Sequence, residues 1–184
     1  MKKLKTVAFL ARWPGLLVLR ELRENPLIDL RAVYTHGLLP KAEGQGRRPE
    51  LYHFEQECGK DVPLYLTDIP STPGVGPVDL DLIIAVSWRY YINQIFIERA
   101  KTAINIHRGD LPKYAGAEPV KQALEAGEKR FAITAHHMTD RIDAGNPIAV
   151  VWADPPVLEA GAIRDYLVPL YVPLVRLAIE AVAR

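Results

Sequence analysis

The chain contains little sulfur and has almost no net charge. Its 184 residues include one cysteine, Cys58, and its 23 Lys and Arg nearly balance its 22 Asp and Glu. A single thiol allows no disulfide within the chain and fits a reducing compartment. The balanced charge lacks the basic excess that is typical of proteins that bind duplex nucleic acid. We therefore expect a cytoplasmic protein with an inert thiol and no nucleic-acid partner.

Long apolar runs and a glycine-rich nucleotide motif are also missing. No stretch approaches the roughly 18 consecutive apolar residues of a membrane span, so we expect no membrane partner. The apolar run 6–11 is short and lacks a small-residue cleavage site, which favours a first strand over a signal peptide. The segment after it, "ARWPG", contains only Gly15, whereas a dinucleotide site would show G-x-G-x-x-G.

The apolar pattern predicts alternating strands and helices in a chain of one-domain length. We expect a single domain over residues 1–184. The predicted strands are 4–11, 27–36, 62–67, 80–87, 102–107, 131–138 and 147–153. The predicted helices are 14–25, 49–59, 93–101, 118–129 and 162–184, the last one interrupted near Pro169 and Pro173. Alternation over the first two-thirds of the chain predicts an α/β fold, a Rossmann-like three-layer domain with a mainly parallel central sheet. The closely spaced runs 131–138 and 147–153 predict an antiparallel strand toward the C-terminus.

One predicted strand ends with two polar side chains in "INIHRGDLPKYAG", residues 104–116. Asn105 and His107 are two residues apart, so both point to one face of the strand. Burying an amide and an imidazole costs free energy unless each finds a partner. Either the two side chains cap the turn that follows, or they do chemistry there.

A second polar cluster is "HHMTDRIDAGNP", residues 136–147. Asp140 and Asp143 flank a turn that Gly145 closes, which is typical of either a surface turn or a functional loop. His136 and His137 point to opposite faces if the strand continues, so they should not share a metal ion. We predict no metal site.

The stretches "INIHRGDLPKYAGAEPVKQAL" and "RIDAGNPIA" resemble the folate-dependent formyltransferase family, which includes enzymes acting on glycinamide ribonucleotide, methionyl-tRNA and amino sugars. The family pattern is Asn-x-His, then Pro-Ser-x-Leu-Pro, a glycine, and Asp-x-Gly about 36 residues after the histidine. The matching residues here are Asn105, His107, Leu111, Pro112, Gly116, Asp143 and Gly145. Two features depart from the family: Arg108-Gly109 replaces Pro-Ser, and the glycine-rich phosphate loop after the first strand is missing.

The resemblance implies one-carbon transfer, with 10-formyltetrahydrofolate as co-substrate and no metal. The formyl group would pass to a primary amine of a small molecule, and a nucleotide-linked amino sugar is the leading candidate. Three alternatives stay open: a formyltetrahydrofolate hydrolase, a methionyl-tRNA formyltransferase-like protein without the tRNA-binding domain, and a folate-binding module that has lost catalysis. The final helix either forms a homodimer interface or packs on its own sheet.

The resemblance also assigns the site residues. The catalytic residues would be Asn105 and His107, donating to the formyl oxygen, and Asp143, keeping His107 charged and relaying a proton. The predicted cofactor-binding residues are Ser87, Trp88, Arg89, Tyr90, Tyr91, His136, Met138, Thr139, Asp140 and Ile142. The candidates for the acceptor side are Arg12, Trp13, Thr35 and Lys41.

Overall fold

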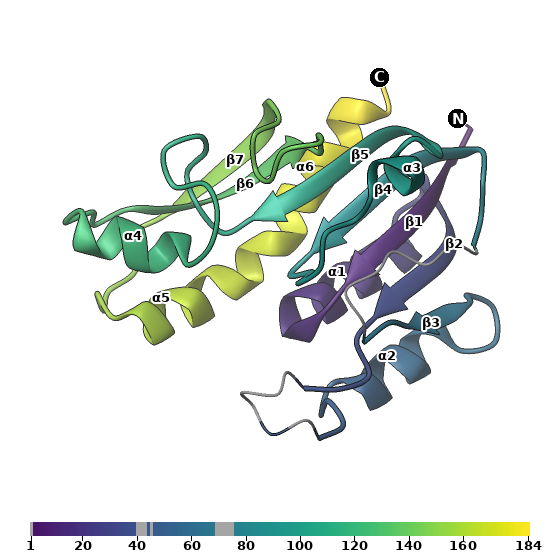
Figure 1. Cartoon of the computed structure of the whole chain (residues 1–184), viewed down its shortest axis with the longest axis horizontal. Coiled ribbons are helices and arrows are strands. Elements are labelled where there is room, and N and C mark those ends of the chain that lie inside the picture. The colour runs from purple at the N-terminus through teal and green to yellow at the C-terminus, as the bar shows by residue number, and fades with distance from the viewer. Residues whose placement is uncertain (1, 40–43, 45, 69–75) are drawn as a thin grey trace. The chain divides into compact units, whose positions relative to one another are not determined.

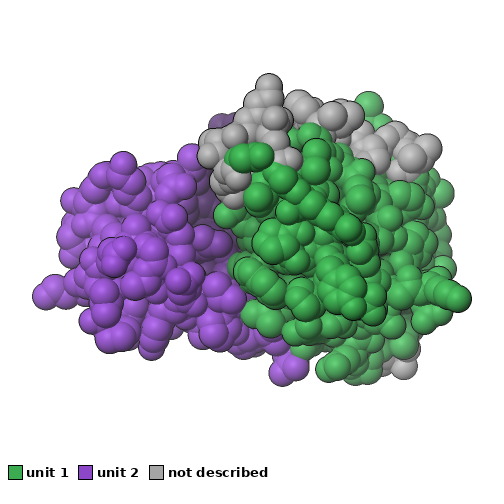
Figure 2. All heavy atoms as spheres, turned by 90° about the horizontal axis from the view of Figure 1, so that it is seen from below, with its two compact units in different colours: residues 1–103 green, residues 104–184 purple. Residues whose placement is uncertain are grey.

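The computed structural model describes residues 2–39, 44, 46–68 and 76–184. These residues group into two compact units, residues 1–103 and residues 104–184 (Figures 1 and 2). The prediction of one domain over residues 1–184 stays a prediction. Lys41 and most of the predicted turn at 70–77 lie outside the described residues.

The first unit is built on parallel strands, as the sequence predicted. Its strands are β1 (Leu4–Leu10), β2 (Ile28–Thr35), β3 (Leu64–Leu66) and β4 (Leu80–Val86), in the order β3-β2-β1-β4 (Figure 1). Each neighbouring pair in this group is parallel. Residues 7–10 of β1 have no exposed surface, because a parallel strand in this fold class is covered on both faces and its residues are accordingly apolar throughout.

The helices of the first unit are α1 (Arg12–Glu24), α2 (Leu51–Cys58) and α3 (Gln94–Ile97). The buried leucines of α1 face β1 and β2, and the helix ends just before Pro26, which restricts the residue ahead of it. The helix predicted at 93–101 is wrong in length. Asn93 caps α3 by accepting a hydrogen bond from the Phe96 N–H at 2.9 Å, and a strand already begins at Ala100.

The second unit contains the predicted antiparallel strands. Its strands are β5 (Ala100–His107, of which 104–107 belong to this unit), β6 (Phe131–His137) and β7 (Pro147–Ala153). Both pairs, β5 with β6 and β6 with β7, are antiparallel. The mainly parallel sheet with antiparallel strands toward the C-terminus is therefore confirmed.

The helices of the second unit are α4 (Pro119–Glu125), α5 (Ala160–Leu167) and α6 (Tyr171–Val182). A single 3-10 turn, Val168–Leu170, separates α5 from α6, so the predicted interruption near Pro169 is confirmed. Pro173 lies in the first turn of α6, where proline is tolerated, so the interruption predicted there is absent. Helix α6 packs on β6 and β7 of its own unit. A homodimer through this helix stays a prediction.

Three findings concern the residues outside the motifs: the state of the thiol, metal binding and membrane spanning. Burial raises the pKa of the Cys58 thiol to about 11, so this buried side chain remains a neutral thiol. Within the described ranges, no three His, Cys, Asp or Glu side chains are grouped so as to hold a metal ion. No helix in that same part of the chain is both long enough and apolar enough to cross a bilayer.

Candidate active site

The register of β5 against β6 sets the first part of the site. Asn105 lies directly opposite His136, and His107 lies opposite Thr134. Residues directly opposite each other in an antiparallel pair have Cβ atoms about 5 Å apart, close enough for their side chains to meet. The Asn105 Nδ2 and His136 Nε2 atoms are 3.1 Å apart, and the Thr134 hydroxyl donates to the Gly109 carbonyl at 2.7 Å. Strand pairing alone therefore brings together the amide and an imidazole.

The turn between β6 and β7 brings in the carboxylate. At Gly145 the chain crosses directly over His137, and a Cβ at position 145 would lie 1.8 Å from the His137 carbonyl oxygen. Only glycine fits there. Asp143 has φ +52°, in the left-handed region that Asp and Asn tolerate better than most other residues. This tight turn places the Asp143 side chain over the end of β5.

The Asp143 carboxylate lies at the centre of the cluster and is only 9% exposed. Its Oδ2 accepts from His107 Nδ1 at 3.1 Å and from the Gly116 N–H at 3.1 Å. Its Oδ1 accepts from Asn105 Nδ2 at 3.3 Å, with His136 Nε2 at 3.4 Å. Burial alone would raise the pKa of Asp143, but the hydrogen bonds from His107 and the Gly116 N–H outweigh it and hold the pKa well below its usual value. Asp143 is therefore a stable anion.

His107 is buried, and both of its ring nitrogens are engaged. Nδ1 faces the Asp143 carboxylate, and Nε2 lies 2.7 Å from the Tyr114 carbonyl oxygen. An ionised carboxylate and a carbonyl only accept hydrogen bonds, so each nitrogen donates and the ring is a cation. The predicted ion pair of His107 with Asp143 is present. A hydrogen bond from His107 Nε2 to the formyl oxygen stays a prediction. To make it, Nε2 would have to give up its hydrogen bond to the Tyr114 carbonyl.

His136 and Asn105 complete the cluster. His136 Nδ1 donates to the His137 carbonyl at 2.9 Å, which leaves Nε2 of a neutral ring as an acceptor for the Asn105 amide. Asn105 thus directs one N–H to His136 and the other to Asp143. His136 is buried while His137 is exposed, as their alternation on the strand predicted. His136 therefore orients Asn105, a contact that the sequence alone did not specify.

The predicted cofactor-binding residues of the first unit follow β4. Ser87 adopts φ +52°, and its buried hydroxyl has no hydrogen-bond partner in the described part of the chain. Trp88 stacks on His36 at 4.0 Å between ring centroids, and the Tyr90 hydroxyl donates to the Asp68 carbonyl at 2.9 Å. These contacts of Trp88 and Tyr90 are ordinary aromatic packing. The predicted cofactor contact of this stretch is through its main chain, and it stays a prediction.

Arg89 and Tyr91, in the same stretch, differ in environment. Arg89 Nη2 lies 3.4 Å from Asp68 Oδ1, whereas its buried Nε and Nη1 atoms find no partner among the described residues. Tyr91 is 52% exposed. Buried donors without a partner are uncommon. The cofactor role predicted for Arg89 and Tyr91 stays a prediction.

The remaining predicted residues have varied surroundings. In the second unit, Met138 is half-buried, and three others lie exposed on the turn that carries Asp143: Thr139, Asp140 and Ile142. In the first unit, Arg12 and Trp13 are exposed at the start of α1, whereas Thr35 is buried. The structure thus groups the predicted catalytic residues around Asp143, while the cofactor and acceptor roles stay predictions.

Two groups at the site were missed by sequence reasoning. They are the Tyr114 carbonyl, which accepts from His107, and the Gly116 N–H, which donates to Asp143. Both are main-chain groups, so no side-chain type signals them. The one available clue was Gly116 itself, whose φ of +83° is a conformation that glycine adopts readily.

Comparison with known proteins supports the resemblance seen in the sequence. Residues 74–162 match the family model described as formyl transferase. This range contains Asn105, His107, Asp143 and the turn closed by Gly145. The resemblance to the formyltransferase family is therefore confirmed, and it is carried by the part of the chain that forms the cluster.

Individual relatives give the same family. A methionyl-tRNA formyltransferase of Streptococcus uberis is 30% identical over 149 residues, covering 77% of this chain and 46% of the relative. Another, of Protochlamydia amoebophila, is 36% identical over 95 residues, covering 49% of this chain and 30% of the relative. The chain thus spans about half the length, or less, of the curated relatives it matches.

Solved structures share the fold. The phosphoribosylglycinamide formyltransferase of Brucella melitensis superposes with a TM-score of 0.74 at 18% identity, covering 100% of this chain and 97% of that one. The predicted Rossmann-like formyltransferase fold is therefore confirmed.

Proposed function

Because residues 74–162 match the formyl transferase family model, we propose that this protein transfers a formyl group from 10-formyltetrahydrofolate to a primary amine. One observation carries the proposal: the Asp143 carboxylate lies 3.1 Å from His107 and 3.3 Å from Asn105, so the three residues of the family pattern form one hydrogen-bonded cluster. A cluster that only capped a turn would not need a buried anion and a buried cation together, because burying charge is costly.

The amine nitrogen would first bond to the formyl carbon of the bound folate, and negative charge would develop on the formyl oxygen, where fixed donors lower the barrier. The bond from that carbon to N10 would then break as the carbonyl re-forms, and N10 would take up a proton. Asn105 is the half-exposed member of the cluster, so its amide can exchange the contact with His136 for that oxygen. His107 supplies a fixed positive charge two residues further along the same strand face.

Asp143 has a narrower role than that of a general base. Its lowered pKa makes it a weak proton acceptor, so it does not hold the amine proton for long. It instead keeps His107 charged, orients the Asn105 amide, and directs a proton that passes from the amine to the leaving nitrogen through water.

The acceptor is proposed to be a small-molecule amine, with a nucleotide-linked amino sugar as the leading candidate. Support comes from the start of α1, where a phosphate loop would lie. The Gly15 N–H is already used, since it donates to the Ala11 carbonyl at 3.1 Å, and a Cβ on Gly15 would lie 3.0 Å from the Leu10 backbone. Gly15 thus permits close helix–strand packing and does not form a nest of free N–H groups for a phosphate.

The test is an acceptor panel. The protein is incubated with 10-formyltetrahydrofolate and with nucleotide-linked amino sugars, glycinamide ribonucleotide or methionyl-tRNA, and release of tetrahydrofolate is followed. Release that depends on an amine and disappears in Asp143→Asn, but not in the control Arg141→Gln at an exposed residue of the same turn, supports transfer. Release in water alone supports a hydrolase instead, and folate binding without turnover under all conditions supports a binding module.

A further inference from the structure

The second hydrogen bond of His107 is shaped by residues outside the family pattern. His107 Nε2 donates to the Tyr114 carbonyl at 2.7 Å, a short distance for a nitrogen donor. The side chain of His107 has only 7% exposure, so water does not compete freely for this nitrogen. Whatever fixes the Tyr114 carbonyl therefore also fixes the orientation of the ring that faces Asp143.

Gly109 makes this contact sterically possible. A Cβ at position 109 would lie 2.9 Å from His107 Nε2, 3.0 Å from the Tyr114 carbonyl oxygen and 2.7 Å from Pro119 Cβ. Such an atom would press on both partners of the hydrogen bond. Gly109 stands where the family pattern has serine, so the bond between His107 and Tyr114 depends on a departure of this chain from that pattern.

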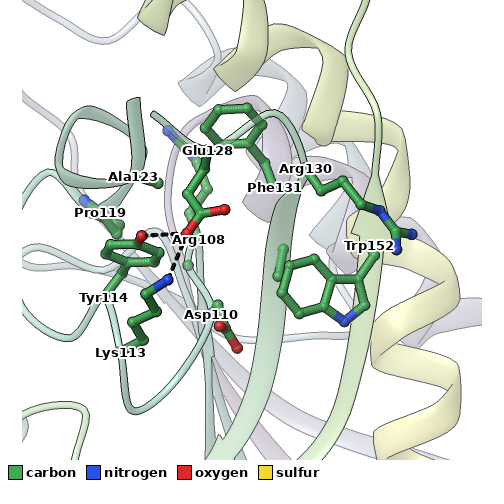
Figure 3. A pocket seen from close by; sticks show the side chains of 12 residues that line it. Arg108, Asp110, Lys113, Tyr114, Pro119, Ala123, Glu128, Arg130, Phe131 and Trp152 are labelled. Atoms are coloured by element: carbon green, nitrogen blue, oxygen red, sulfur yellow. Dashed lines mark hydrogen bonds and ion pairs between the residues drawn. The ribbon is translucent and has the colours of Figure 1, made fainter. Parts of the chain in front are cut away.

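Two hydrogen bonds of Tyr114 itself hold its carbonyl in place. The main-chain N–H of Tyr114 donates to the Asp110 carbonyl at 2.8 Å, and the side-chain hydroxyl donates to Glu128 Oε1 at 2.8 Å. Glu128 also accepts from Lys113 Nζ at 2.5 Å. Figure 3 shows the Tyr114 hydroxyl and the Lys113 ammonium converging on the same carboxylate. The main chain and the side chain of Tyr114 are thus both tied.

Packing alone does not hold the Tyr114 ring in place. Tyr114 and Glu128 both line a cavity of about 130 Å³, together with Phe131 and Trp152 (Figure 3). Open space beside the ring leaves it room to shift if its polar anchor is lost. On the cavity side the ring is restrained by the hydrogen bond of its hydroxyl to Glu128 and by the Lys113 ammonium, which lies 5.0 Å from the ring centroid.

We infer that Tyr114 and Glu128 are positioning residues for His107, acting from Glu128 through the Tyr114 hydroxyl and carbonyl to Nε2. The inference rests on the proposed function only in giving His107 a catalytic task. It adds that the strength of the Nε2 hydrogen bond, and with it the orientation of the imidazolium toward Asp143, is set by a carboxylate outside the cluster.

Imidazole NMR tests the inference without any substrate. In ¹⁵N-labelled protein, the His107 signals are assigned by their loss in His107→Gln, and exchange of the Nε2 proton with water is measured. In Tyr114→Phe, which removes only the hydroxyl, the exchange rate should rise about fivefold, the factor expected for losing one hydrogen bond. Tyr166→Phe is the matched control, because it removes the hydroxyl of an exposed tyrosine in α5 and should leave the rate unchanged. An unchanged rate in Tyr114→Phe, or equal increases in both variants, would overturn the inference.

A second pair of variants tests the role of Gly109. Gly109→Ala and Gly109→Ser add the same Cβ, but the serine hydroxyl can accept from Nε2 in place of the Tyr114 carbonyl. The alanine variant should lose the slowly exchanging Nε2 proton and the serine variant should keep it, with thermal unfolding showing that both are folded. Identical spectra in the two variants would mean that packing, and not the acceptor, matters at this position. Because these readouts need no turnover, a negative acceptor panel would not affect them.

Discussion

His107 Nδ1 lies 3.1 Å from Asp143 Oδ2, and the two side chains are only 7% and 9% exposed. An ion pair at this depth has lost most of its hydration, so its stability depends on the other hydrogen bonds that each partner makes. Gly116 and Asn105 supply them for Asp143, and the Tyr114 carbonyl supplies one for His107. Removing one partner therefore leaves the other as an uncompensated buried charge.

Asp143→Asn is the first prediction. The asparagine keeps the shape of the side chain but cannot balance the His107 cation, and its amide would place a donor near the N–H groups that now donate to Asp143. We expect turnover to fall at least about 10²–10³-fold, comparable to the loss of one preorganised electrostatic contact. The measurement is acceptor-dependent release of tetrahydrofolate, alongside binding of a folate analogue, which should be retained.

The control is Arg141→Gln, at an exposed residue of the same turn that has no predicted site role. It should leave both turnover and folate binding near the native values. Native turnover in Asp143→Asn would remove the carboxylate from the mechanism, whereas loss of binding in both variants would point to a collapsed turn.

His136 provides the second prediction, since its neutral Nε2 accepts from the Asn105 amide at 3.1 Å. In His136→Gln the side-chain oxygen can take the place of Nε2, whereas His136→Leu fills a similar volume without an acceptor. We expect the glutamine variant to keep turnover within about tenfold of native and the leucine variant to lose more, because the Asn105 amide would lose an orienting hydrogen bond worth about 0.5–1.5 kcal/mol. Equal turnover in the two variants would show that His136 only fills space.

The sequence predicted the regular elements, whose buried and exposed side chains follow a periodic pattern along the chain. The buried parts of the parallel strands, such as residues 7–10 of β1 and 82–86 of β4, are apolar, and side-chain alternation correctly placed Asn105 and His107 on one face. The helix at 93–101 failed because short apolar runs do not separate helix from strand. There the cap by Asn93 and the start of β5 at Ala100 decided the outcome.

The site was only partly predictable, for a similar reason. The motif spacing pointed to His107 and Asp143, but it could not supply the register that puts His136 opposite Asn105, because strand pairing is a long-range property. It also could not supply the Tyr114 carbonyl, since a main-chain acceptor leaves no trace in residue type. Such contacts emerge only once the turns are folded.

Gly145 underlies the third prediction, which concerns stability. A Cβ there would lie 1.8 Å from the His137 carbonyl oxygen, so Gly145→Ala must push the turn away from β6. We expect a loss of about 1–3 kcal/mol or more in the free energy of unfolding, the range for overpacked sites, measured by urea denaturation. Turnover should fall as well, because the same turn carries Asp143.

A matched glycine is available in α5. The nearest atom to a Cβ on Gly161 is Glu159 Oε1 at 3.5 Å, so Gly161→Ala meets no clash and restricts the unfolded chain. It should stabilise the protein by about 0.4–1 kcal/mol. If Gly145→Ala were as stable as Gly161→Ala, the close crossing over His137 would not exist.

The fourth prediction concerns pH and His36 in the first unit. Burial lowers the pKa of His36 to about 4; the hydrogen bond to the Thr67 carbonyl opposes the shift, and the charges of Arg89 and Arg48 reinforce it. Between pH 6.5 and about 4 the unfolded chain binds a proton at His36 that the folded chain does not. The folded state therefore loses stability as the pH falls through this window, by about 3 kcal/mol at most.

Urea denaturation at several pH values from 7 to 4.5, followed by circular dichroism, measures this loss. His36→Gln should flatten the slope, because the glutamine does not titrate, whereas His137→Gln, at an exposed histidine, should leave it unchanged. Asp143 does not obscure the result. Its pKa is lowered, so the stability it contributes is lost only below the usual carboxyl pKa of about 4. A slope that survives His36→Gln would mean that another group takes up the proton, and that the stacking of His36 on Trp88 does not keep the ring neutral.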